Sequence, residues 1–205
     1  MNTIGIIGCG GINSWLLHHL HDLMGAFFVK DDIYIKLFDD DLVEEKNLLR
    51  GNQNFTINDL MQSKAKVLGE RYKMDFEETF ITKDNITTLD PFKIIILGVD
   101  NNKTRQMVYD YCLTHKIFLI DLRAQGTQIM YVVINGNKPM DYYNAKYFNN
   151  EQLMERVGSC QLQQDIQNDH VECGNKIIAH IGVYGLLLKK LREEELLNTE
   201  WRWVY

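Results

Sequence analysis

The sequence lacks the features that mark several classes of protein. Its four cysteines include no C-x-x-C pair, which argues against both a zinc ribbon and a secreted disulfide framework. No apolar run approaches the roughly 20 residues of a membrane span, and the first residues carry no basic segment typical of a targeting peptide. Only two prolines occur, and no Pro/Gly/Ser-rich linker divides the chain. We therefore expect a reduced, cytoplasmic protein with no membrane partner.

An excess of basic residues is also missing. The 22 lysines and arginines are outnumbered by 28 acidic residues, which gives a net charge of −6. A protein that binds a phosphate backbone needs a strongly basic face, so nucleic acid is an unlikely partner. The length of 205 residues is close to that of one domain at about 150 residues per domain. We expect a single domain over residues 1–205.

Short apolar runs alternate with helical patterns along much of the chain. Buried strands are predicted at residues 3–7, 33–38, 93–97 and 117–121, and further strands at 128–134 and 201–205. Helices are predicted from residue 12, from Thr56 through Leu68, around residues 107–111 and over residues 175–197, with a loop at 135–150. This alternation predicts an α/β fold with a Rossmann-like, doubly wound, mostly parallel sheet.

Polar clusters follow three of the predicted strands. They are the glycine-rich turn at residues 8–13, the carboxylates Asp39 and Asp41, and the segment at 98–102. In open α/β sheets, ligands bind beyond the carboxyl ends of the strands, and a glycine turn before a helix can receive a phosphate. The pattern predicts nucleotide binding, with a purely structural tight turn as the alternative. The dinucleotide pattern G-x-G-x-x-G is incomplete, because residue 13 is asparagine.

Several motifs occur in one order along the chain: G-x-G-G at residues 8–11, Asp39-x-Asp41-x-Val43, and Asn47-Leu48-Leu49-Arg50. Together they resemble the ThiF/MoeB type of adenylating enzyme, an ATP-binding fold shared with ubiquitin-activating enzymes. The resemblance continues through Lys64, Asp100-Asn101, Arg105 and the helical segment 177–190, and covers about residues 3–190.

The resemblance implies a set of roles around ATP. Gly8, Gly10 and Gly11 would bind the nucleotide, Asp39 the ribose, and Asp41 would order the loop. The phosphates would be surrounded by Asn47, Arg50 and Lys64, and Mg²⁺ would be held by Asp100. Arg50, Lys64 and Asp100 would then be the catalytic groups, because cationic and amide donors stabilise charge that gathers on phosphorus.

The resemblance also implies a substrate and a partner. The C-terminal glycine carboxylate of a ubiquitin-like or sulfur-carrier protein would react with ATP to give an acyl-adenylate and pyrophosphate. Cys160 is a candidate thiol for attack on that adenylate, with a structural or merely exposed thiol as the alternative. The apolar segment 175–197 is typical of a helix that packs on the sheet and on a second copy, so we expect a homodimer.

Other interpretations remain open at this point. The enzyme could be a tRNA-modifying adenylating dehydratase, a non-catalytic nucleotide-binding partner subunit, or an NAD(P)-dependent oxidoreductase. Lys64 could belong to a solvated helix face. His18, His19 and His21 could bind a metal, although surface or groove packing is favoured because their spacing on a helix does not direct all three at one ion.

Overall fold

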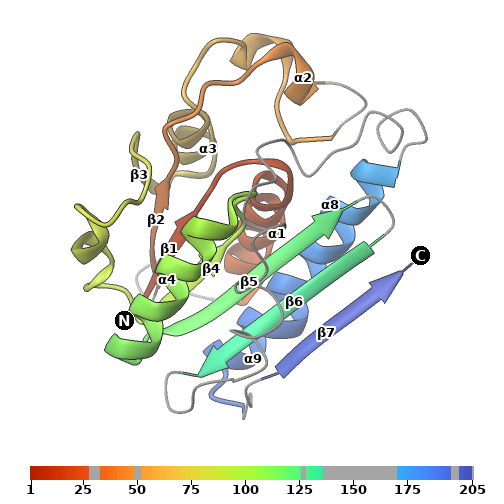
Figure 1. The fold of residues 1–205 in the computed structure, drawn as a ribbon. Helices are drawn as coiled ribbons and strands as arrows, with labels where there is room; N and C mark the ends of the chain where they lie inside the picture. Colours follow the sequence, from red (N-terminus) through yellow and green to blue (C-terminus); the bar gives the residue numbers. More distant parts are fainter. Residues whose placement is uncertain (28–32, 49–51, 126–127, 136–169, 195–198, 205) are drawn as a thin grey trace.

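A seven-stranded sheet lies at the centre of the computed structural model, which describes residues 1–27, 33–48, 52–125, 128–135, 170–194 and 199–204 (Figure 1). The strand order is β3-β2-β1-β4-β5-β6-β7. The strands are β1 (Asn2–Ile7), β2 (Ile33–Phe38), β3 (Asp75–Glu77), β4 (Ile94–Leu97), β5 (Phe118–Gln125), β6 (Gln128–Asn135) and β7 (Thr199–Val204). Strands β1 to β5 are parallel, and β6 and β7 are antiparallel. The predicted fold class is confirmed.

Helices cover both faces of this sheet. One face carries α1 (Gly11–Phe27), α3 (Lys64–Tyr72), α8 (His170–His180) and the π-helical turns η6 (Ile181–Leu187), which α9 (Leu188–Leu191) continues. The other face carries α4 (Asn102–His115) and the 3₁₀ turn η4 (Ile86–Leu89). Two short elements, α2 (Glu45–Leu48) and η3 (Ile57–Asp59), lie between β2 and α3. None of the described helices combines the length and apolar character needed to cross a membrane.

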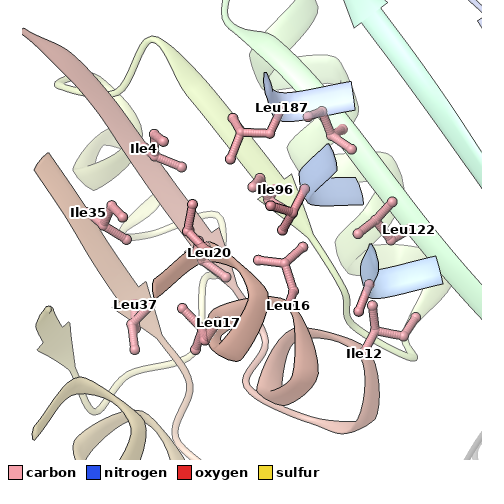
Figure 2. Packing of buried hydrophobic residues seen from close by; sticks show 14 of the residues in the cluster. Ile4, Ile12, Leu16, Leu17, Leu20, Ile35, Leu37, Ile96, Leu122 and Leu187 are labelled. Carbon is pink, nitrogen blue, oxygen red and sulfur yellow. The ribbon is translucent and has the colours of Figure 1, made fainter. Parts of the chain in front are cut away.

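The central strands are apolar because both of their faces are covered. Ile4, Ile6 and Ile96 are fully buried, and Leu16 and Leu20 of α1 pack in the same cluster (Figure 2). Continuous apolar runs of this kind are typical of parallel strands between two helical layers. The chain moves outward from β1 to β2 and β3 on one side and from β4 to β5 on the other. The order therefore reverses between β1 and β4, the position where such sheets bind ligands.

The predicted helix start at Thr56 is wrong. Thr56 precedes only η3, where the Asp59 carboxylate accepts the Thr56 N–H at 2.7 Å. Met61 then has a left-handed φ of 63°, which prevents the helix from continuing. The helix begins at Lys64, after Ser63, whose hydroxyl accepts the Lys66 N–H at 3.3 Å.

The late helix differs from its predicted range of 175–197. It begins at His170, contains the π-helical segment at 181–187, and ends at Leu191. Ile178, Val183 and Leu187 are fully buried in the core of the same chain. Much of the apolar surface that motivated the dimer is therefore covered within one chain, and the homodimer stays a prediction. The strand predicted at 201–205 is β7, which lies at the edge of the sheet. Most of the predicted loop at 135–150 lies outside the described residues.

Candidate functional site

The turn after β1 brings Gly8, Gly10 and Gly11 to the start of α1. Gly8 has a φ of 84°, a conformation that other residues rarely adopt, and its N–H donates to the Phe38 carbonyl at 2.9 Å. A side chain at Gly10 would meet no atom within 4 Å, so the space beside the turn is open. The first turn of α1 contains no acidic residue, and its unpaired N–H groups favour an anion.

Asp39 joins the end of β2 to this turn. Its Oδ2 accepts the Cys9 N–H at 2.5 Å, and its Oδ1 accepts the Asp41 N–H at 2.8 Å. The residue is only 9% exposed, and this burial raises the pKa of its carboxyl group, while the two N–H donors and the charge of Lys64 oppose the rise. The structure thus brings the predicted ribose ligand and the predicted phosphate turn together.

Lys64 and Asp41 form an ion pair at the start of α3. The Lys64 Nζ lies 2.7 Å from Asp41 Oδ2, and the Lys64 N–H donates to the Asp41 carbonyl at 2.9 Å. The Lys64 side chain is 8% exposed, against 66% for Asp41. The solvated-face interpretation of Lys64 is therefore wrong, because the lysine is a buried cation whose partner faces solvent.

The two residues predicted from the segment after β2 have different outcomes. Asn47 is 3% exposed, and its Oδ1 accepts the Glu44 N–H at 2.7 Å, so it holds the turn that precedes α2. Arg50 lies outside the described residues. Their contacts with phosphate stay predictions.

Asp100 follows β4 at the same edge of the sheet, with an exposed side chain. The next residue, Asn101, caps α4 by accepting the Lys103 N–H at 2.8 Å. A hydrogen bond from Lys46 to Glu44 raises the pKa of Lys46, and the charges of Asp41 and Asp100 raise it further. The carboxylates of Asp41 and Asp100 therefore both lie close enough to Lys46 to raise its pKa.

The carboxylate oxygens at this edge are of the type that binds Mg²⁺. In the described part of the chain, one group of at least three possible ligands lies within 4.8 Å of one another: Asp39, Asp40 and Asp41. The Asp39 oxygens already accept two backbone N–H groups. Mg²⁺ usually binds one or two carboxylates together with substrate phosphates, and an exposed carboxylate such as Asp100 fits that requirement. The assignment of Mg²⁺ to Asp100 stays a prediction.

Arg105, one of the residues that carry the resemblance to ThiF/MoeB enzymes, stabilises the segment that follows β4. Its guanidinium donates to the Val99 carbonyl and pairs with the fully buried Asp121. Arg123 also donates to Asp121, with its Nε 2.9 Å from Oδ2. These contacts hold the Asp100 segment against β5, so Arg105 has a structural role.

Asn13 has a role that the sequence did not predict. The residue is fully buried, and its Nδ2 donates to the Gly8 carbonyl at 2.7 Å. A Cβ at Gly98 would lie 2.6 Å from this Nδ2, so the side chain of Asn13 occupies the space beside Gly98. Its Oδ1 has no hydrogen-bond partner among the described residues. The sequence contained an indication of this role, because asparagine occupies the position where the dinucleotide pattern requires glycine.

A pocket of about 210 Å³ opens between the loop after β3 and the start of α4. Its lining comes from Phe80, Ile81, Thr82, Lys83, Lys103, Thr104 and Met107. Both segments follow strand ends at the edge that carries Asp39 and Asp100, and the accessible lining is mostly apolar. Such a pocket can accept a flat apolar ring.

Two cysteines and one of the clustered histidines pack against other side chains in the described part of the chain. Cys9 and Cys112 are buried free thiols, and burial raises both pKa values, that of Cys112 to about 12. His19 packs on the rings of His180 and Tyr184, as the packing interpretation predicts. Cys160 lies outside the described residues.

Comparisons with known proteins agree with this geometry. Residues 2–187 match the model of the ThiF family. A search of the curated proteins finds no match.

Three solved structures share the fold over the full length of this chain. Escherichia coli MccB with AMPCPP and selenomethionine MccA has a TM-score of 0.73 at 18% identity, and E. coli MccB with ATP has 0.72 at 17%. A crystal structure of selenomethionine PaaA has 0.68 at 14%. This chain covers 61%, 60% and 61% of the three neighbours, respectively. It therefore corresponds to less than two thirds of each.

Proposed function

Because this chain belongs to the ThiF family, we propose that it is an ATP-dependent adenylating enzyme. Its acceptor would be the C-terminal glycine carboxylate of a ubiquitin-like or sulfur-carrier protein. The observation that carries the proposal is the meeting of three groups at one sheet edge: the glycine turn, Asp39 bonded to that turn, and the buried Lys64–Asp41 pair. A neighbour that contains both AMPCPP and MccA supports a site for a nucleotide and a second substrate.

The proposed reaction needs positioning and charge neutralisation. A carboxylate oxygen attacks the α-phosphorus of ATP, an O–P bond forms, and the bond to the bridging oxygen breaks as pyrophosphate leaves. Negative charge on the phosphoryl oxygens is stabilised by Lys64 and by the N–H groups that begin α1. Mg²⁺ at Asp100 would neutralise further phosphate charge. Neither a protein nucleophile nor a net proton transfer is required for this step.

The alternatives make different demands on the protein. A tRNA-modifying dehydratase would need a basic surface, which the net charge of −6 does not favour. A non-catalytic partner subunit would bind ATP without forming an adenylate. The proposal also includes attack on the adenylate by Cys160 and assembly as a homodimer. The free thiols of Cys9, Cys112 and Cys173 fit the expected reducing cytoplasm.

We expect ATP with Mg²⁺ to bind in preference to NADH, because Asn13 occupies the position of the third glycine of the dinucleotide pattern and Lys64 provides a cation close to Cys9 of the turn. Isothermal calorimetry measures both affinities. Asp39→Asn should weaken ATP binding at least about tenfold, because both carboxylate oxygens of Asp39 accept backbone N–H groups, whereas an asparagine amide has one oxygen and would set its NH₂ group against the other donor and accept ribose hydroxyls less well. Asp40→Asn, at the exposed neighbouring position, is the matched control and should leave the affinity unchanged. Micromolar binding of NADH without binding of ATP would contradict the adenylation hypothesis.

We also expect the pocket beside α4 to accept the adenine base. Met107→Trp should fill it and weaken ATP binding at least about tenfold, while tripolyphosphate, which has no base, should bind as before. His115→Trp places the same ring at the opposite end of α4 and should change neither affinity. Equal weakening of ATP and tripolyphosphate by Met107→Trp would show that the pocket does not hold the base.

A further inference from the structure

A buried amide of the C-terminal helix reaches the start of α1. Asn175 of α8 is 5% exposed, and its Nδ2 donates to the carbonyl of Asn52 at 3.2 Å and to the Asn52 Oδ1 at 3.0 Å. Asn52 is itself 4% exposed. The two residues are 123 positions apart, so only the packing of α8 brings them together.

The same amide touches the glycine turn. A Cβ at Gly11 would lie 2.4 Å from Asn175 Nδ2, so the glycine leaves the space that the amide fills. One turn later on α1, the Trp15 Nε1 donates to the Asn52 carbonyl at 3.3 Å. The Nζ of Lys176 lies 4.3 Å from the centre of the Trp15 ring. Helix α8 therefore contacts both α1 and the segment at residues 52–54.

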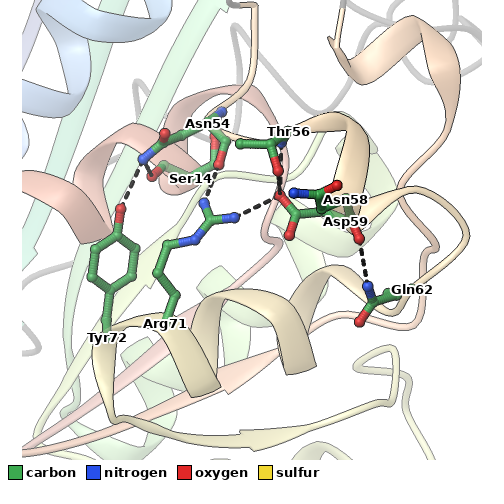
Figure 3. Close-up of polar contacts among 8 residues, drawn as sticks. All are labelled: Ser14, Asn54, Thr56, Asn58, Asp59, Gln62, Arg71 and Tyr72. Atoms are coloured by element: carbon green, nitrogen blue, oxygen red, sulfur yellow. Dashed lines mark hydrogen bonds and ion pairs between the residues drawn. The ribbon is translucent and has the colours of Figure 1, made fainter.

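Polar contacts from α1 and α3 also reach the Asn54 end of this segment (Figure 3). The Asn54 N–H donates to the Ser14 hydroxyl at 3.0 Å, and the Asn54 Nδ2 donates to the Tyr72 hydroxyl at 2.8 Å. Arg71 donates to the Asn54 carbonyl at 2.5 Å and pairs with Asp59 at 2.6 Å. Ser14 of α1 and two residues of α3 thus contact the Asn54 end of the segment, while Asn175 and Trp15 contact its Asn52 end.

We propose that Asn175 is a positioning residue for the phosphate-binding turn. Its amide fixes the position of residues 52–54 relative to Gly11 at the start of α1. The inference rests on the proposed function for the identity of the ligand. An apolar side chain would avoid the cost of burying an amide at this helix position, and it could not donate to Asn52. Loss of the contact with Asn52 lets the start of α1 move, and displacements of about 1 Å are costly where donors must match phosphate oxygens.

The test compares three ligands in one variant. Asn175→Ala should weaken the binding of ATP and of tripolyphosphate at least about tenfold, and should change the affinity for adenosine less than about threefold, because the base pocket lies on the other face of the sheet. Ile178→Val, one turn later in the same buried face of α8, is the matched control and should leave all three affinities unchanged. Asn52→Ala should reproduce the phosphate-specific loss, and the double variant should lose no more than either single variant.

Hydrogen exchange tests the positioning role of Asn175 independently of the ligand that the protein binds. The amides of residues 52–54 should lose protection in Asn175→Ala and keep it in Ile178→Val. Unchanged protection, or an equal loss of affinity for adenosine and tripolyphosphate, would overturn the positioning role. If the parent protein bound no ATP, that result would contradict the proposed function alone. The exchange measurement would still decide whether Asn175 holds residues 52–54 in place.

Discussion

Replacing Lys64 by methionine should reduce adenylate formation at least about 100-fold, the usual cost of removing one preorganised donor from developing charge. The Lys64 side chain is 8% exposed and pairs with Asp41, and it lies close enough to Cys9 of the glycine turn to act on its thiol electrostatically. A cation in a partly desolvated position acts more strongly on phosphate oxygens than a solvated one does. The measurement is ATP–pyrophosphate exchange with a synthetic peptide that ends in Gly-Gly and with candidate carrier proteins.

Lys66→Met is the matched control, because Lys66 is exposed on the same helix and should be dispensable. The fold should survive Lys64→Met, since the remaining partner Asp41 is 66% exposed and can be hydrated. A similar loss of exchange in both variants would contradict the assignment of Lys64 to the phosphates.

Asp121→Ala should lower the free energy of unfolding by about 3–5 kcal/mol, the range for breaking a buried ion pair from one side. Asp121 is fully buried and accepts from both Arg105 and Arg123. Its removal leaves the 4% exposed Arg105 without its carboxylate partner. Urea unfolding followed by circular dichroism measures this loss.

Asp90→Ala provides the comparison at an exposed carboxylate. Asp90 Oδ1 lies 3.8 Å from His115 Nδ1 and accepts the Tyr111 hydroxyl, and its side chain is 53% exposed, so its removal should cost less than about 1 kcal/mol. If Asp121→Ala cost no more than Asp90→Ala, the buried pair would not be what stabilises the end of β4 beside β5.

The class of fold and the sheet edge that carries the candidate site can be predicted from the sequence alone. Apolar runs such as residues 3–7 and 93–97 predict buried strands, because a parallel strand covered on both faces contains few polar side chains. The glycine turn, Asp39 and Asp100 each follow such a strand, so the alternation alone places them at one edge. These features depend on near neighbours in the chain.

Which distant groups meet at that edge depends on how the helices and strands pack on one another. Burial of Lys64 depends on how α3 packs beside the segment after β2, and the helical pattern around it fits a solvated face equally well. The contact of Asn175 with Asn52 joins residues 123 positions apart. Likewise, Asn13 occupies space that Gly98, on another strand end, leaves open. Such contacts arise from the packing of whole elements, because local periodicity specifies which face of a helix is apolar but not which residue lies opposite it.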